Sequence, residues 1–108
     1  MPFEVFLTKD AERDLEDLYS YIFLHDSPEK AAYVLDRIEE AFSSLNENPE
    51  RGAYPGKLLA LGIREYREVF FKPYRILFKV ISDRVYGVLI ADGRRDMQAL
   101  LQKRLLEG

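Results

Sequence analysis

The chain contains no cysteine and only one histidine among its 108 residues. The absence of cysteine excludes disulfides and thiolate metal ligands, and a single histidine argues against a histidine-built metal site. No apolar run approaches the roughly 18 to 20 residues that a bilayer-spanning helix needs, and residues 1–10 lack the basic-then-apolar order of a signal peptide. We therefore expect a cytoplasmic protein that has no membrane contact, metal or cofactor.

Acidic and basic residues are unevenly divided, although the net charge is only −3. Residues 1–50 carry four Lys/Arg against 13 Asp/Glu, whereas residues 51–108 carry 12 Lys/Arg against six Asp/Glu. This division predicts an acidic face and a basic face with different roles, and uneven surface decoration is the simpler alternative. Because the acidic half repels a phosphate backbone, we expect only modest general affinity for nucleic acid.

The length and the apolar content predict one folded domain over residues 1–108, since 47% hydrophobic residues are enough for a single core. The alternating run at 3–7 predicts a first strand. Two helical patterns follow, over 9–24 and from 28 to about 46, each with an apolar stripe at helical spacing. A connection of about four residues between them predicts an αα-hairpin.

Capping residues mark the start of both predicted helices. Thr8 can cap the first helix, and Ser27 followed by Pro28 is a typical start signal for the second. His25 falls in the connection and is expected to be a surface loop residue. The carboxylates of the first helix, Asp14 among them, alternate with the apolar stripe, so we expect them to form a solvated face rather than a metal site.

The second half of the chain reads as a sheet. Three runs rich in Val, Ile, Tyr and Phe begin at 63 and are broken at 72–73 and 82–83, which predicts a three-stranded antiparallel meander. An extended loop is expected over 48–62, and an amphipathic helix follows the basic turn at 94–95. The fold class is therefore α+β: a strand, an αα-hairpin, a three-stranded antiparallel meander and a C-terminal helix.

The middle strand of the meander has two different faces. One face carries Tyr74, Ile76, Phe78 and Val80 and is expected to pack against the two helices, while the other carries Arg75, Leu77, Lys79 and Ile81. The second face is half apolar, so something should cover it. Both the chain's own final helix and a partner protein remain open as the cover.

Four segments in order resemble the ParE/RelE superfamily of bacterial type II toxins: TKDAERDLEDLYSYI, NPERG, YREVFFKPYRILFKV and IADGRRDMQALL. The likeness spans nearly the whole chain. It implies a small α+β toxin that a cognate antitoxin wraps and blocks. It also implies one of two targets, which are DNA gyrase for ParE-like members and messenger RNA in the ribosomal A site for RelE-like members.

Two departures from the RelE pattern favour the ParE side. RelE-like ribonucleases cut by attack of a 2′-hydroxyl, which requires proton-transfer groups as well as cations. Arg67, Arg75 and Arg95 match three basic positions of that pattern, but Val69 and Leu101 stand where a second basic residue and a tyrosine are expected. The resemblance thus implies a plasmid-stabilisation-type gyrase inhibitor without catalytic residues. The alternative is a metal-independent, ribosome-dependent mRNA endoribonuclease that uses the three arginines.

The residues expected to meet partners follow from this resemblance. The expected contacts with the target are Arg67, Arg75, Arg94 and Arg95, and the expected contacts with the antitoxin are Leu77, Ile81, Met97 and Leu101. Arg75 has a structural alternative, an ion pair with Asp92 or Glu68. A family member that has lost its toxicity and only binds its partner is the third interpretation.

Overall fold

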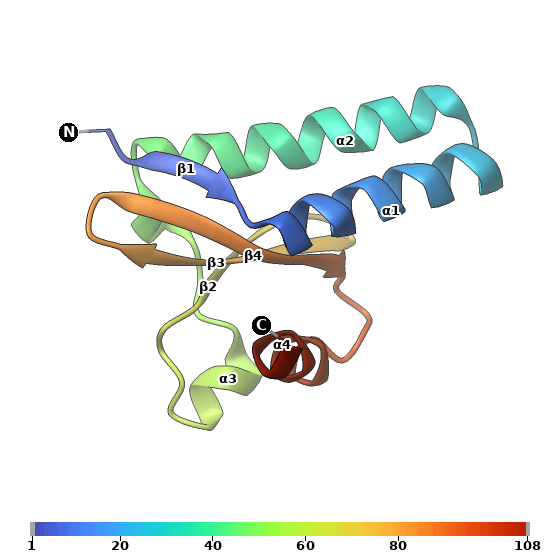
Figure 1. The fold of residues 1–108 in the computed structure, drawn as a ribbon. Helices are drawn as coiled ribbons and strands as arrows, with labels where there is room; N and C mark the ends of the chain where they lie inside the picture. Colours follow the sequence, from blue (N-terminus) through green and yellow to red (C-terminus); the bar gives the residue numbers. More distant parts are fainter. Residues whose placement is uncertain (1, 108) are drawn as a thin grey trace.

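A four-stranded sheet separates two helical layers in the computed structural model, which describes residues 2–107 (Figure 1). The elements in chain order are β1 (Glu4–Leu7), α1 (Lys9–His25), α2 (Pro28–Ser43), the 3-10 turns η1 (Ser44–Asn46) and η2 (Pro49–Arg51), α3 (Gly56–Ala60), β2 (Arg67–Phe71), β3 (Tyr74–Ile81), β4 (Arg84–Asp92) and α4 (Met97–Glu107). The predicted α+β class and element order are confirmed. Among residues 2–107, no helix has both the length and the apolar character needed to cross a bilayer.

The meander forms as predicted and gains a fourth strand. The strand order is β1-β4-β3-β2; β2, β3 and β4 pair antiparallel, and β1 pairs parallel to β4. The two breaks are tight turns, one containing the cis Lys72–Pro73 peptide and the other containing Ser82 at a positive φ of 55°. The first run begins later than expected, since β2 starts at Arg67 rather than near residue 63.

The helical hairpin starts at the predicted caps. The Thr8 side chain accepts a hydrogen bond from the Ala11 amide. The Ser27 side chain, directly before Pro28, accepts one from the Lys30 amide. The placement of His25 in the connecting loop was wrong. It is the last residue of α1, which ends one residue later than predicted, and its ring stacks on Tyr21 with 4.2 Å between centroids.

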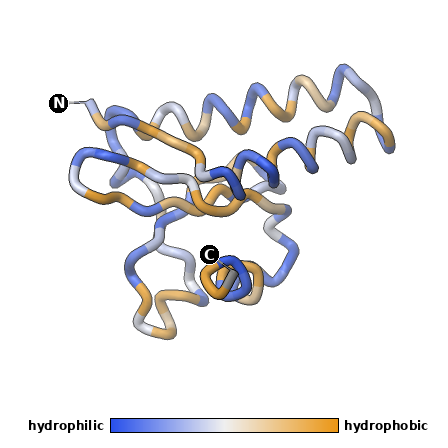
Figure 2. Tube along the Cα trace, viewed as in Figure 1, coloured by the Kyte–Doolittle hydropathy of each residue, from blue (hydrophilic) through white to orange (hydrophobic). Residues whose placement is uncertain are grey.

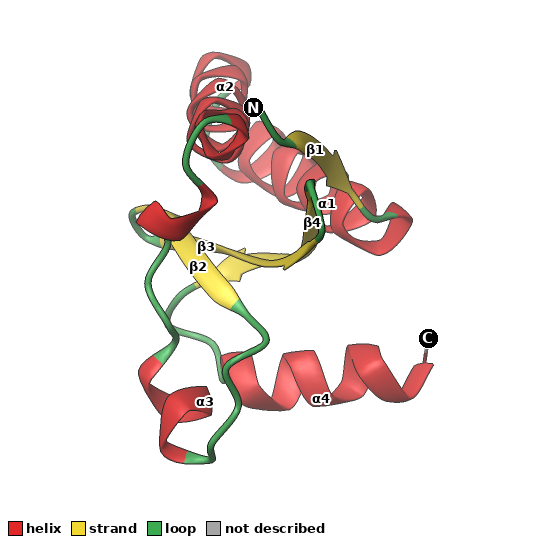
Figure 3. Ribbon diagram, turned by 90° about the vertical axis from the view of Figure 1, so that its left-hand side faces the viewer, coloured by secondary structure: helices red, strands yellow, loops and turns green. Residues whose placement is uncertain are grey.

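Helices α1 and α2 cover one face of the sheet and form the first core with it (Figure 3). Ile76 and Phe78 are fully buried there, as the alternation of β3 predicts. Gly87 is needed in β4, because a Cβ atom at that position would lie 2.7 Å from Leu7 and 3.0 Å from Phe42. Val80 belongs to the same face but is 40% exposed, because it lies near the end of the strand.

Helices α3 and α4 cover the opposite face and enclose a second core. Leu77 and Leu89 contribute to it from the sheet, and Met97 and Leu101 contribute from α4. The pairing of β3 with β4 skips Val88, so two consecutive residues of β4 face α4. The chain's own helix therefore covers Leu77 on this half-apolar face, whereas Ile81 at the end of β3 is 52% exposed. Figure 2 shows apolar segments along the strands between the two helical layers.

A partly buried ion pair joins α4 to the first helix. The Arg104 guanidinium donates to both carboxylate oxygens of Asp14, at 2.6 and 2.8 Å, and also to the Val88 carbonyl at 2.9 Å. Asp14 accepts a further hydrogen bond from the Ile90 amide at 3.0 Å. The expectation that Asp14 belongs to a solvated face was therefore wrong, since this carboxylate joins α1, β4 and α4.

Candidate functional site

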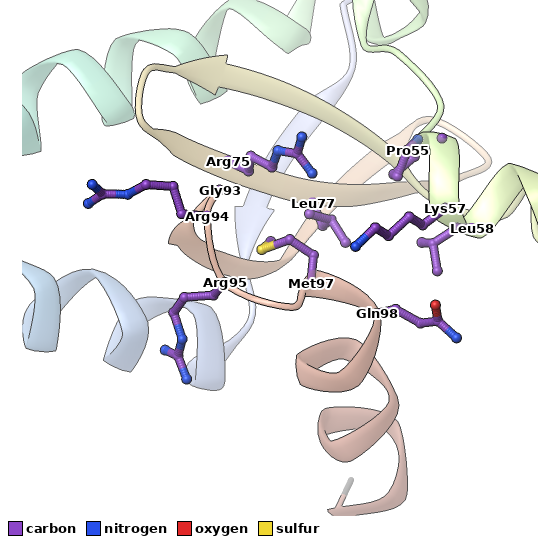
Figure 4. Close-up of a pocket in the computed structure, with 11 residues that line it drawn as sticks. Pro55, Lys57, Leu58, Arg75, Leu77, Gly93, Arg94, Arg95, Met97 and Gln98 are labelled. Carbon is purple, nitrogen blue, oxygen red and sulfur yellow. The ribbon is translucent and has the colours of Figure 1, made fainter.

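A pocket of about 270 Å³ opens where the second face of the sheet meets α3 and α4 (Figure 4). Its apolar wall is formed by Leu58, Leu77 and Met97. Its cationic residues are Lys57, Arg75, Arg94 and Arg95, and the remaining lining residues are Pro55, Gly56, Gly93 and Gln98. No His, Asp, Glu or Tyr is among these lining residues. The pocket therefore offers positive charge and apolar contact, and Lys57 is the one lining side chain of a type commonly used for general acid–base chemistry.

Three of the four cations keep their side-chain donors available. Among the side chains of residues 2–106, the Lys57 ammonium and the Arg95 guanidinium have no hydrogen-bond or ion-pair partner. Arg75 has only a long ion pair, 3.8 Å from Nη1 to Glu68 Oε2. In Figure 4, Lys57 extends from α3 towards Leu77 and Met97, whereas Arg95 points away from them. An anionic partner would find unengaged donors on three elements.

Arg94 is already engaged. Its side chain donates to both oxygens of Asp92, at 3.0 and 2.6 Å, and its amide donates to the same carboxylate at 2.9 Å. These side-chain and backbone hydrogen bonds from Arg94 hold the pKa of Asp92 below its usual value. Arg94 and Arg95 also line a larger groove, about 580 Å³, where Asp14 and Asp17 add negative charge. The basic turn thus separates a cationic pocket from a groove of mixed charge.

Arg67 lies on the other face of the sheet and does not join this site. It pairs with Phe78, whose side chain points into the first core, whereas Arg75 pairs with Phe70 on the pocket side. The Arg67 guanidinium donates to the carbonyls of Glu50 and Gly52 and to the Tyr54 hydroxyl at 2.9 Å, and it stacks 4.3 Å above the Tyr54 ring. This arginine clamps the loop before α3, so the three arginines of the ribonuclease alternative do not meet around one phosphate.

From the sequence, Glu68 was expected only as one of two possible ion-pair partners of Arg75. It is 4% exposed, and its Oε2 atom has no hydrogen-bond partner among the described residues. Burial raises the pKa of Glu68, and the nearby Arg75 offsets only part of that effect. The two-residue turn at 72–73 could have predicted the position of Glu68. Because that turn pairs Phe71 with Tyr74, it also pairs Glu68 with Leu77, on the pocket side of the sheet.

The residues expected to meet the antitoxin are mostly internal. Leu77, Met97 and Leu101 are 0%, 6% and 3% exposed and form the second core, so a partner reaches them only if α4 moves off the sheet. Ile81 is 52% exposed at the end of β3. Their role in antitoxin binding stays a prediction. Within residues 2–107, no three His, Asp or Glu side chains lie close enough together to hold a metal ion.

Comparison with known proteins identifies a family pattern and a fold. The family model described as the ParE toxin of the type II toxin–antitoxin system parDE matches residues 5–97. Comparison with curated proteins finds no match.

Three solved structures, two from toxin–antitoxin systems and one of a toxin in the free state, have folds similar to that of this chain. The chromosomal ParDE system from P. aeruginosa matches with a TM-score of 0.70 and 22% identity, covering 83% of this chain and 95% of that one. The RelBE2 toxin–antitoxin complex from Mycobacterium tuberculosis matches with a TM-score of 0.56 and 23% identity, covering 85% and 99%. A double arginine-to-alanine variant of the E. coli toxin RelE in the free state matches with a TM-score of 0.64 and 12% identity, covering 99% and 98%.

Proposed function

This chain belongs to the ParE toxin family of type II toxin–antitoxin systems, and we propose that it acts by binding DNA gyrase and stabilising the cleaved gyrase–DNA complex. The family match gives the toxin role, and the choice of gyrase rests on the candidate site. The observation that supports it best is a pocket whose lining holds four cations and no His, Asp, Glu or Tyr. Such a surface suits binding to an anionic group, and among its lining side chains only Lys57 is of a type commonly used for proton transfer.

The unengaged cations define the proposed contact. Lys57, Arg75 and Arg95 project from α3, β3 and the turn before α4. Lys57 extends towards the apolar wall and Arg95 points away from it, so these residues present separate donors in different directions. Arg94 adds its charge to the surface while bound to Asp92. An acidic surface of gyrase or the phosphates of its DNA would meet these groups, and the acidic hairpin would discourage binding to DNA alone.

A gyrase cleavage assay tests the proposal. Purified toxin at micromolar concentration is incubated with gyrase, ATP and supercoiled plasmid, and linear DNA is measured after protein digestion. We expect linear DNA to increase with toxin concentration, and pre-incubation with the cognate antitoxin should abolish the effect. Unchanged supercoiling with no linear product at micromolar toxin would remove gyrase as the target.

One observation keeps ribosome-dependent mRNA cleavage as the second candidate. Lys57 is an amine in the pocket wall near two arginines that match the RelE pattern, so a proton carrier not foreseen from the sequence is present. Under this alternative, Lys57 would exchange the proton while Arg75 and Arg95 hold the scissile phosphate. Mapping of transcript 5′ ends after induction separates the two functions, because codon-phased cuts within translated frames would arise only from the ribonuclease.

We also propose a cognate antitoxin as the partner of the exposed apolar residues near the sheet edge and the end of α4. Ile81, Leu105 and Leu106 are 52%, 57% and 82% exposed. An amphipathic segment laid over them would have to bury roughly 800 Å² on each side to form a stable complex. Co-expression with the adjoining open reading frame and co-purification of a stoichiometric complex tests this; Ile81→Lys should weaken the complex.

A further inference from the structure

A buried carboxylate lies behind the pocket without satisfying its own hydrogen-bonding capacity. Glu68 is the one charged residue among those described that is buried to this degree, at 4% exposed, and its Oε2 atom has no hydrogen-bond partner there. Keeping a carboxylate in such surroundings costs stability, since no protein donor among the described residues replaces the lost hydration of this oxygen. The stability of this fold does not explain that arrangement.

Two other arginines of this chain form ion pairs in which the guanidinium donates short hydrogen bonds to a carboxylate. Arg104 donates twice to Asp14 at 2.8 Å or less, and Arg94 donates to both oxygens of Asp92. Arg75 differs, because its nearest nitrogen lies 3.8 Å from the Glu68 carboxylate, beyond hydrogen-bond distance. The charge of Glu68 therefore attracts the guanidinium without occupying its five N–H donors.

The stem of Arg75 is held from two further sides. The guanidinium carbon lies 5.5 Å from the centre of the Phe70 ring, directly across from Arg75 in β2. On the side of β4, Gly93 leaves the space that the arginine fills: a Cβ atom there would lie 3.0 Å from Arg75 Nε and 3.1 Å from Cδ. Its φ is not positive, so the requirement for glycine comes from this close approach and from the Pro73 carbonyl, also at 3.0 Å.

We propose that Glu68 and Gly93 are positioning residues that hold the Arg75 guanidinium in a fixed orientation at the pocket, with its donors left for an anionic group of the target. The nature of that target rests on the function proposed above. Glu68 itself is too buried to touch a ligand and does not line the pocket, so it acts only through Arg75. Holding the side chain in advance avoids the entropy loss that a mobile arginine suffers on binding.

Two variants that disturb Arg75 from opposite sides test the proposal. Glu68→Gln removes the charge and keeps the shape, and Gly93→Ala adds the methyl group that crowds Nε and Cδ. The matched control is Glu65→Gln, an exposed neighbour on the same segment. Gly56→Ala, where a Cβ atom meets nothing within 4 Å, is a control for stability and for Arg75 mobility only, because Gly56 lines the pocket. All four variants are first compared with the wild-type chain by thermal denaturation.

The decisive readout is the mobility of the arginine itself. ¹⁵N relaxation of the Arg75 Nε–H group should give a restricted side chain in the wild type and in both controls. In Glu68→Gln and Gly93→Ala, its order parameter should fall into the flexible range, below about 0.6. In the gyrase cleavage assay, the toxin concentration for half-maximal DNA cleavage should rise about 3- to 10-fold in the same two variants, as expected for one side chain that must be ordered on binding.

The possible results distinguish a failure of the proposed positioning role from a failure of the proposed gyrase target. If Arg75 Nε stays as ordered in both variants as in the wild type, the positioning role is wrong, whatever the toxin does to gyrase. If the order falls while the half-maximal concentration stays unchanged, the positioning serves no target contact and the proposal also fails. If wild-type toxin leaves gyrase unaffected, the proposed target is wrong, and the relaxation comparison still decides whether Glu68 and Gly93 hold Arg75.

Discussion

Replacing Asp14 by alanine should destabilise the chain far more than its place on the acidic face of α1 suggests. The change removes two charge-assisted hydrogen bonds between Arg104 and Asp14 and one from the Ile90 amide, together with the charge of the Asp14 carboxylate beside the Arg104 guanidinium. Hydrogen bonds to charged groups contribute about 1.5–3 kcal/mol each, and breaking a buried pair costs about 3–5 kcal/mol. The side chains of Arg104 and Asp14 remain 23% and 16% exposed, so water compensates in part and we expect a loss of about 2–3 kcal/mol.

For a domain of this size, that loss corresponds to a decrease in Tm of about 8–12 °C. Circular dichroism at 222 nm during heating measures it, and Glu16→Ala, an exposed carboxylate on the same helix, is the matched control with an expected change of no more than about 2 °C. A double-mutant cycle with Arg104→Ala should give a coupling of about 1.5–2 kcal/mol. A Tm for Asp14→Ala equal to that of Glu16→Ala would refute the view that this pair fastens α4.

Three further predictions follow from other contacts. Gly87→Ala should lower the free energy of unfolding in urea by about 1–3 kcal/mol through overpacking, whereas Gly56→Ala, with nothing within 4 Å, should leave it nearly unchanged. Arg67→Ala should cost about 1–2 kcal/mol, because three hydrogen bonds to the loop are lost, and should speed hydrogen exchange at residues 50–54; an unaltered loop would contradict the clamp. The pKa of Asp92 is lowered in the folded state, so the stability that its carboxylate contributes is present above its unfolded pKa and is lost as the pH falls through the folded pKa. Arg94→Gln should therefore have a lower Tm than the wild type at pH 7 and the same Tm in strong acid, and thermal denaturation at a series of pH values measures this difference.

The fold was predictable from local signals. Capping at Thr8 and Ser27, helical spacing in both hairpin helices and turns at 72–73 and 82–83 each depend on neighbouring residues, so the sequence contains them directly. The short helix α3 was missed, because five residues between Pro55 and Leu61 show no full helical period. The pair formed by Asp14 and Arg104 spans 90 positions and depends on how α4 crosses the sheet, which no local pattern specifies.

The site was predictable in part, and the register explains which part. Arg75, on β3, and Arg94 and Arg95, in the turn between β4 and α4, do line one pocket. Arg67 was grouped with them on the family pattern, although a two-residue turn places it opposite Phe78 and hence on the other face. Lys57 enters the pocket only because α3 lies beside the start of α4. Residues 48–62 were predicted to form an extended loop, so this contact with the predicted C-terminal helix was not foreseen.

The most direct test compares wild-type toxin with the Arg75→Gln/Arg95→Gln double variant in the gyrase cleavage assay, after both are shown to have the same Tm. Loss of two charged contacts at about 1.4 kcal/mol each should raise the half-maximal toxin concentration by about 100-fold. We expect the variant to remain folded and to trap cleaved DNA only at this higher concentration. A double variant as potent as the wild type would contradict the proposed function, because Arg75 and Arg95 would then contribute nothing to binding the target.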